Sequence, residues 1–213
     1  MNPIDHLILG APSYEAGLAY GKDCLGVEAK EGGRHGGLGT RNALVGLGPA
    51  QYLEILAPDA DTDDRSPYRD GLERMPAPGL VGVMAACGDL DALADAGRAA
   101  GLQTPGPAPF SRTTPDGRTL NWRLLSFTRH PYGTAVPTFI DWAHTPNPAE
   151  SLPADMSLAG FALAVQDVDG LRRVHEVLEF EADLERSETP HMKAVFTTPK
   201  GDVAIEGPIL TFK

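Results

Sequence analysis

The sequence predicts an α+β fold assembled from repeated βαβββ modules, in which one strand and one helix precede three further strands. Three observations support this fold class. The order of strand, capped helix and three strand-like stretches occurs three times, apolar residues recur at helical spacing, and glycine or proline separates the strand-like stretches. The modules span residues 2–58, 79–145 and 157–213. We expect the first two to form one domain, residues 1–145, against which the third packs.

The first module begins with the strand-like stretch IDHLILG and continues into a helix that Ser13 can cap and Gly26 can end. Three strand-like stretches follow, and the last of them is QYLEILAP, residues 51–58. Its aromatic and aliphatic residues favour a strand, and the final proline ends the run. Glu54 lies in the middle of this run, where an ionised carboxylate is costly to desolvate unless a partner pairs with it.

The second and third modules repeat this order. The strand that begins near residue 79 leads to Asp89 as N-cap of an Ala-rich helix. The strand that begins near residue 157 leads to Asp167 as N-cap of a helix with apolar residues at helical spacing. The connections, residues 59–78 and 146–155, are polar and rich in proline, and we expect both to be surface loops.

The composition favours a protein that acts on small molecules or on other proteins. The formal net charge of −11 disfavours nucleic acids and anionic membranes as partners, because their phosphate groups repel a surface of that sign. No segment has the length and apolarity of a membrane span, and the N-terminus lacks the pattern of a signal peptide. Two cysteines are too few for a disulfide scaffold. We therefore expect a cytoplasmic protein with reduced thiols.

Residues with functional side chains emerge when the modules are aligned on their N-caps. Seven residues before the N-cap, the first module has His6, whereas the other two have Gly82 and Gly160. The last strands of the three modules align Glu54, Asp141 and Glu206. An acid at one position in all three copies indicates a site, although Asp141 and Glu206 also lie close to strand ends and could be solvated acids.

These features resemble the vicinal oxygen chelate superfamily, which includes glyoxalase I, extradiol dioxygenases, fosfomycin-resistance enzymes and bleomycin-resistance proteins. The stretches IDHLIL, GGRHGGLGTRNAL, QYLEILAP, TTPDGRTLNWRL and PTFIDW are similar to its glyoxalase-like domain branch. The resemblance covers the first two modules nearly end to end. It implies curled mixed sheets, in which the first and fourth strands of a module lie side by side around an open cup.

The resemblance and the alternation of side chains along a strand together place His6 and Glu54 inside this cup. The resemblance implies that His6 and Glu54 hold a divalent metal such as Zn, Ni, Mn or Fe, for which an imidazole and a carboxylate are suitable ligands. Members of the superfamily also use ligands from a second module. Asp141 or Glu206 would then complete the metal site or act, like Glu54, as a catalytic group. The alternative is a His6 that is hydrogen-bonded to Glu54 in a polar pocket without metal.

Several residues in the signature stretches are candidates for binding the substrate. The Gly-rich loop EGGRHGGLGTRN would turn close beside the cup and bring Arg34 and His35 to its mouth. Arg123 lies in an otherwise apolar strand and needs either an acidic partner such as Asp141 or an anionic ligand. The candidate substrate-binding residues are Arg34, His35, Asn42, Arg123 and Trp142, of which the tryptophan could instead belong to the core.

Two hypotheses about function follow. In the first, the protein is a glyoxalase-like lyase or isomerase in which a divalent metal acts as a Lewis acid on a small, oxygen-chelating, anionic substrate. In the second, it is a metal-free binding protein that sequesters a small molecule, as bleomycin-resistance proteins do. Both predict a small-molecule ligand and neither nucleic acid nor membrane as partner. Superfamily members often pair modules between chains, so a homodimer is one expectation and internal pairing through the third module is the other.

Overall fold

The computed structural model describes residues 1–114 and 117–211, so residues 115–116 of the TTPDG stretch and the end of the predicted third module, residues 212–213, lie outside the described residues. The first module contains β1 (Ile4–Gly10), α1 (Tyr14–Tyr20), the π-helix η1 (Gly21–Leu25), β2 (Lys30–His35), β3 (Thr40–Gly48) and β4 (Gln51–Pro58). The second contains β5 (Gly79–Ala86), α3 (Leu90–Ala99), β6 (Ala108–Thr113), β7 (Thr119–Leu125), the 3-10 helix η2 (Gly133–Ala135) and β8 (Thr138–Asp141). The third contains β9 (Ser157–Val165), α4 (Val168–Val177), β10 (Asp183–Arg186), β11 (His191–Thr198) and β12 (Gly201–Pro208).

The threefold recurrence of strand, helix and three strands is therefore confirmed. Each predicted N-cap also acts as one. The side chains of Ser13, Asp89 and Asp167 accept hydrogen bonds from the backbone N–H three residues ahead. Gly26 ends the first helical segment in the left-handed conformation, with φ at +75°, which glycine adopts without strain.

The first two modules share one curled, eight-stranded sheet with the order β2-β3-β4-β1-β5-β8-β7-β6. Within each module the first strand runs parallel to the fourth, and β1 and β5 join the modules as an antiparallel pair. The two edge strands, β2 and β6, approach each other, and the guanidinium of Arg112 donates a hydrogen bond across this seam to the carbonyl oxygen of Gly32. The sheet thus comes close to forming a closed barrel, as the resemblance implied.

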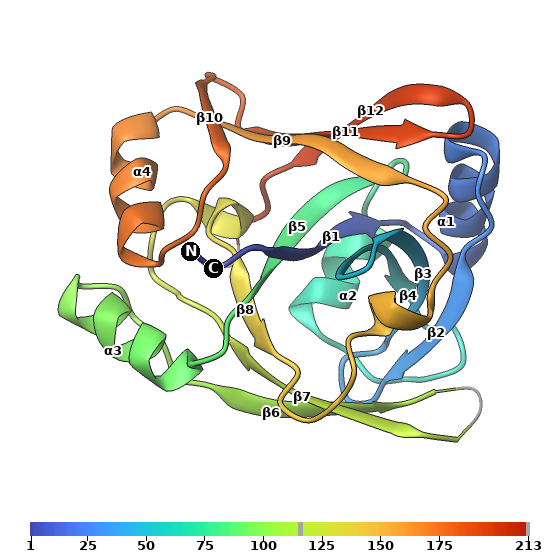
Figure 1. The fold of residues 1–213 in the computed structure, drawn as a ribbon, viewed down its shortest axis with the longest axis horizontal. Helices are drawn as coiled ribbons and strands as arrows, with labels where there is room; N and C mark the ends of the chain where they lie inside the picture. The colour runs from blue at the N-terminus through green and yellow to red at the C-terminus, as the bar shows by residue number, and fades with distance from the viewer. Residues whose placement is uncertain (115–116, 212–213) are drawn as a thin grey trace.

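The third module has the predicted order of elements but pairs its strands differently. Its sheet has the order β10-β9-β11-β12, so β9 lies between β10 and β11 instead of beside the last strand. The predicted equivalence of β12 with β4 and β8 is therefore wrong. This sheet covers the outer face of the eight-stranded sheet, with α4 and α1 at its two ends (Figure 1).

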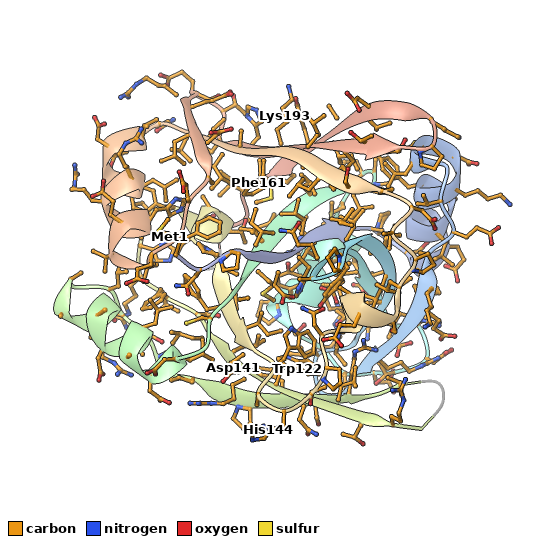
Figure 2. The ribbon with its side chains drawn as sticks, in the orientation of Figure 1. Met1, Trp122, Asp141, His144, Phe161 and Lys193 are labelled. Atoms are coloured by element: carbon orange, nitrogen blue, oxygen red, sulfur yellow. The ribbon has the colours of Figure 1, made fainter. Side chains whose placement is uncertain are left out.

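The core lies between the two sheets and beneath the helices. It joins apolar side chains on the outer faces of the central strands to those of the third module, including Leu7, Leu53, Phe139, Phe161, Met192 and Phe196. Figure 2 shows side chains filling this layer around the labelled Phe161. The inward faces of the same strands remain free to line the inside of the curled sheet.

The connection between the first two modules is not the simple surface loop that its composition predicted. It contains α2 (Pro67–Glu73), which Ser66 caps and Pro67 begins. Leu72 of this helix is fully buried and packs in a small cluster with Ile8 and Leu56. The second connection contains the short 3-10 helix η3 (Pro148–Ser151). No helix within residues 1–114 and 117–211 has the length and apolarity to cross a membrane.

His175 of α4 is a buried imidazole that should make the fold sensitive to acid. Its Nε2 lies 2.9 Å from the carbonyl oxygen of Ala135, which can only accept, so Nε2 carries the proton. Nδ1 is buried without a hydrogen-bond partner, and the ring packs edge-on against Phe180. Burial lowers the pKa of His175 below its ordinary value.

We expect this histidine to lower the free energy of unfolding as the pH falls below about 6.5, the ordinary histidine pKa. The unfolded chain takes up a proton there that the folded protein binds only at lower pH, so stability rises with pH in this window. His175→Gln keeps a donor for Ala135 and removes the titration. Urea unfolding between pH 7.5 and 5.5 should show a smaller loss of stability for this variant than for wild type or for the control His144→Gln, which alters an exposed histidine. Equal losses in all three proteins would contradict the prediction.

Candidate functional site

The inward faces of the eight-stranded sheet enclose a cavity of about 500 Å³. Aromatic and aliphatic side chains make up most of its wall, among them Ile8, Leu56, Tyr68, Met84, Phe110, Trp122, Ile140 and Trp142. Several side chains with ionisable or amide groups line the same cavity, among them Arg129 and His130. We refer to five that come from β1, β2, β3, β4 and β6 as the polar cluster: His6, His35, Asn42, Glu54 and Arg112. An apolar cavity with a few convergent polar groups is the usual form of a small-molecule site.

The strand register explains why these side chains converge. In the parallel pair of β1 and β4, His6 lies opposite Tyr52 and Ile8 opposite Glu54. Because side chains alternate along a strand, all four of these residues project to the same face. Asn42 of β3 pairs with Leu56 on the other side of β4, which brings its amide beside Glu54. The prediction that His6 and Glu54 share the inside of the cup is confirmed.

Hydrogen bonds fix the orientation of His6. Its Nδ1 lies 2.6 Å from Oδ1 of Asp5, a side chain that is only 2% exposed. Asp5 also accepts hydrogen bonds from Trp142 Nε1 at 3.1 Å and Asn147 Nδ2 at 2.9 Å. Because the carboxylate accepts, the imidazole proton lies on Nδ1. Nε2 faces Oε2 of Glu54 at 3.7 Å, and the His6 ring stacks on Tyr52.

Glu54 is held by its neighbours in the polar cluster. Its Oε1 accepts a hydrogen bond of 2.5 Å from Asn42 Nδ2 and lies 3.9 Å from His35 Nε2. Nδ1 of His35 is bound to the Thr40 hydroxyl at 3.0 Å. Burial lowers the pKa of His35, which keeps this imidazole neutral near pH 7. Burial likewise raises the pKa of Tyr52, so this phenol stays protonated.

Two arginines that the sequence nominated lie outside the polar cluster. Arg34 is about half exposed and forms ion pairs with Asp59 and Asp61. Arg123 lies opposite the candidate partner Asp141 in the pairing of β7 with β8, but its ion pair of 2.8 Å is with Asp91 on the surface. Neither arginine lines the main cavity. Trp142, another candidate substrate-binding residue, does line the main cavity, and its ring centroid lies 5.5 Å from that of Trp122.

Asp141 is not at the position equivalent to Glu54. The residue four positions before the N-cap pairs with the fourth strand in both modules, as Leu9 with Ile55 and Ala85 with Phe139. By this register Glu54 corresponds to Thr138, which lines the cavity. The carboxylate of Asp141 instead accepts a hydrogen bond from the backbone N–H of Ala143 in the turn after β8.

Glu206 is also separated from the polar cluster. It is an exposed residue of β12 and lies 3.7 Å from Lys193. Lys193 projects from the outer side of the second sheet, away from the eight-stranded sheet (Figure 2). The different strand order of the third module accounts for this placement. β12 is an edge strand of the four-stranded sheet and does not belong to the eight-stranded sheet that encloses the cavity.

Sequence reasoning missed Asp5 and Arg112. Asp5 lies next to His6 in a strand, where alternation predicts opposite faces, yet its carboxylate reaches back to the imidazole. Arg112 lies on β6, far in the sequence from the first module, and enters the cluster only because the sheet curls until β2 and β6 meet. Asp5 could have been found as an acid beside a histidine that was predicted to bind a metal. Arg112 could not have been found in this way, because its position depends on the approach of two edge strands that lie far apart in the sequence.

The residues present do not fit the metal site that the superfamily implies. His6 and Glu54 offer an imidazole and a carboxylate, but their counterparts in the second module are Gly82 and Thr138, which supply no imidazole or carboxylate. The Asn42 amide nitrogen occupies one oxygen of Glu54. Within residues 1–114 and 117–211, no group of three or more His, Cys, Asp or Glu side chains is arranged to hold a metal ion. A metal held by His6 and Glu54 stays a prediction.

Comparison with known proteins places the fold. The chain matches the family model of the glyoxalase-like domain over residues 4–178. A hypothetical protein from Staphylococcus aureus is 15% identical with a TM-score of 0.67, and the match covers 97% of this chain and 85% of that one. A mutant of 4-hydroxymandelate synthase from Streptomyces coelicolor is 15% identical with a TM-score of 0.55, over 97% of this chain and 63% of that one.

Methylmalonyl-CoA epimerase from Mycobacterium tuberculosis is 19% identical with a TM-score of 0.44, over 65% of this chain and 85% of that one. Among curated proteins, none matches the chain. At 15% identity, the two structures with TM-scores of 0.67 and 0.55 show a shared fold alone. Because the family model spans both modules that build the cavity, the chain belongs to the glyoxalase-like domain family of the vicinal oxygen chelate superfamily.

Proposed function

We propose that the protein is a glyoxalase-like isomerase or lyase that transfers a proton at a carbon next to a carbonyl group of a small substrate. One observation carries this proposal. Two groups that can bind and release protons, His6 Nε2 and Glu54 Oε2, lie 3.7 Å apart in the wall of a single cavity. General acid–base catalysis needs such groups within hydrogen-bond reach of one substrate.

The hydrogen bonds around His6 and Glu54 determine which atom of each side chain is free to act on a substrate. Asp5 keeps a proton on Nδ1 of His6, which leaves Nε2 as a base. Asn42 holds one oxygen of Glu54, which leaves the other to face the cavity. One of the two groups removes the proton from the C–H bond, and the bonding electrons move into the carbonyl to give an enolate. The removed proton passes across the 3.7 Å between Nε2 and Oε2 to the other group, which delivers it to a neighbouring carbon of the enolate and so completes an isomerisation.

A second candidate function is metal-free sequestration of a small molecule. The observation that favours it is the character of the cavity wall, which is aromatic and aliphatic over most of its area. The Trp122 ring stacks with Phe110 and lies tilted beside Trp142, and such surfaces bind planar or apolar ligands without chemistry. Binding without turnover distinguishes this candidate from the enzyme.

Deuterium exchange tests the enzyme directly. The protein is incubated in D₂O with a panel of small carbonyl compounds, and loss of the C–H signal next to the carbonyl is followed by NMR. We expect wild type to catalyse exchange for at least one compound. Glu54→Gln should reduce the rate at least about a hundredfold, since a positioned acid or base contributes 10²–10⁴-fold. The control Glu31→Gln alters a half-exposed glutamate paired with Arg41 and should leave the rate unchanged.

A metal arm accompanies this experiment. Zn(II), Ni(II), Mn(II) and Fe(II) are added to chelator-treated protein, and both exchange and the melting temperature are measured. An ion that binds the folded state raises the melting temperature by mass action. Exchange in the chelator-treated protein supports proton transfer by the side chains alone. Exchange that requires an ion, together with a rise in melting temperature that Glu54→Gln abolishes, would replace this proposal with the metal-dependent form. Binding without any exchange would favour sequestration.

A further inference from the structure

Arg112 is the arginine of the polar cluster, and among the described residues no carboxylate forms an ion pair with it. It is 6% exposed and lines the main cavity. Its NH1 donates a hydrogen bond to the carbonyl oxygen of Gly32. In the part of the chain that the structure describes, no Asp or Glu carboxylate forms an ion pair with it, in contrast to Arg34, Arg69 and Arg123.

A buried guanidinium without a carboxylate partner is energetically unfavourable. Its desolvation lowers the pKa of Arg112, and the more distant negative charge of Glu54 offsets this effect only in part. A bound anion would relieve the cost. The planar guanidinium could grip a carboxylate through two parallel hydrogen bonds, and such bonds strengthen where water is excluded.

The rest of the cavity defines the body of the ligand. Phe110 lies two residues before Arg112 on β6, so the two side chains project to the same face of the strand. The Phe110 ring stacks near Trp122, and Met84 and Ile140 add aliphatic surface. A volume of about 500 Å³ lies in the range of cavities that hold drug-sized molecules, well above what a two- or three-carbon acid would fill.

We propose that the cavity binds an amphipathic carboxylic acid, with its carboxylate on Arg112 and an aromatic or aliphatic body against Phe110, Trp122 and Met84. This inference rests on the proposed function, because the same cavity contains the reacting pair, and it names the class of substrate. Arg112 and Glu54 both line the cavity as members of the polar cluster. The acid group and the reactive C–H bond therefore belong to the same end of the substrate.

Calorimetry with two matched series tests this inference. The first series is butanoate, hexanoate, octanoate and 3-phenylpropanoate, and the second is the corresponding primary amides. We expect the acids to bind more tightly than the amides at every length. Each added methylene should strengthen binding by up to about fourfold, which is the effect of about 0.8 kcal/mol per buried CH₂ group.

Variants assign the preference for acids to Arg112. Arg112→Met should weaken binding of the acids at least tenfold and leave the amides unchanged. Arg112→Gln removes the charge and can still donate to Gly32, so it gives the same result if the methionine variant fails to fold. The control Arg98→Met removes a surface arginine paired with Asp95 and should bind like wild type. Each variant is first checked for a cooperative unfolding transition.

The outcomes separate this inference from the proposed function. Equal binding of acids and amides by wild type would overturn it, and so would unchanged acid binding in both Arg112 variants. An affinity that does not rise with chain length would overturn the apolar body of the ligand. If acids bind through Arg112 but no compound of the carbonyl panel undergoes exchange, the proposed function fails and the binding site stands.

Discussion

Replacing Gly207 with alanine is expected to lower the free energy of unfolding by about 3 kcal/mol or more, because β12 lies against the backbone of β5. A Cβ at Gly207 would overlap the backbone carbonyl oxygen and nitrogen of Leu80. Leu80 is fully buried in a central strand that is hydrogen-bonded on both sides, so it cannot move aside. The strand of the third module would have to shift instead. Thermal unfolding should show a melting temperature lower by about 6–12 °C.

Gly160→Ala provides the matched control for this substitution. Gly160 lies in β9 of the same sheet, and a Cβ added there meets no atom within 4 Å. Its melting temperature should stay close to that of wild type. A Gly207→Ala protein as stable as the control would show that the contact between β12 and β5 does not support the fold. Loss of stability in both would point to backbone flexibility of the glycines instead of the close approach.

Local patterns predicted the modules because the signals for each element lie close together in the sequence. Asp89 and Asp167 each precede a helix and bind its first turn, and apolar alternation marks the strands. The same reasoning could have found α2, because Ser66 followed by proline is a helix start. The polar, proline-rich composition of the surrounding stretch favoured a surface loop instead.

Register between distant strands could not be predicted in this way. Asp141 and Thr138 differ by three residues along β8, but only the ladder with β5 decides which of them matches Glu54. A shift by an odd number of residues moves a side chain to the other face of a sheet. Arg112 depends on a still longer-range event, the approach of the two edges of the sheet. Pairing within one module, as between His6 and Glu54, was predictable because the family geometry specifies it.

Removing the carboxylate of Asp5 is expected to have the largest effect on stability of any change in the site. Asp5→Ala removes the acceptor of three donors, on the buried His6 and on the partly buried Trp142 and Asn147. Breaking such a buried network typically lowers the free energy of unfolding by about 3–5 kcal/mol. We expect a fall in melting temperature of about 6–20 °C. Asp91→Ala, which removes an exposed partner of Arg123, should have little effect.

Asp5→Asn separates the structural role of this residue from its role in orienting His6. The remaining side-chain oxygen can still accept from Trp142 and Asn147, as Oδ2 does in wild type, so this variant should be more stable than Asp5→Ala. The new amide N–H would then face Nδ1 of His6 and donate to it, which moves the imidazole proton to Nε2. Nitrogen NMR of the imidazole should report this change of tautomer. Exchange should fall by at least about a hundredfold while acid binding through Arg112 persists. A folded Asp5→Asn protein that exchanges as fast as wild type would remove His6 from the reaction and leave Glu54 as its base.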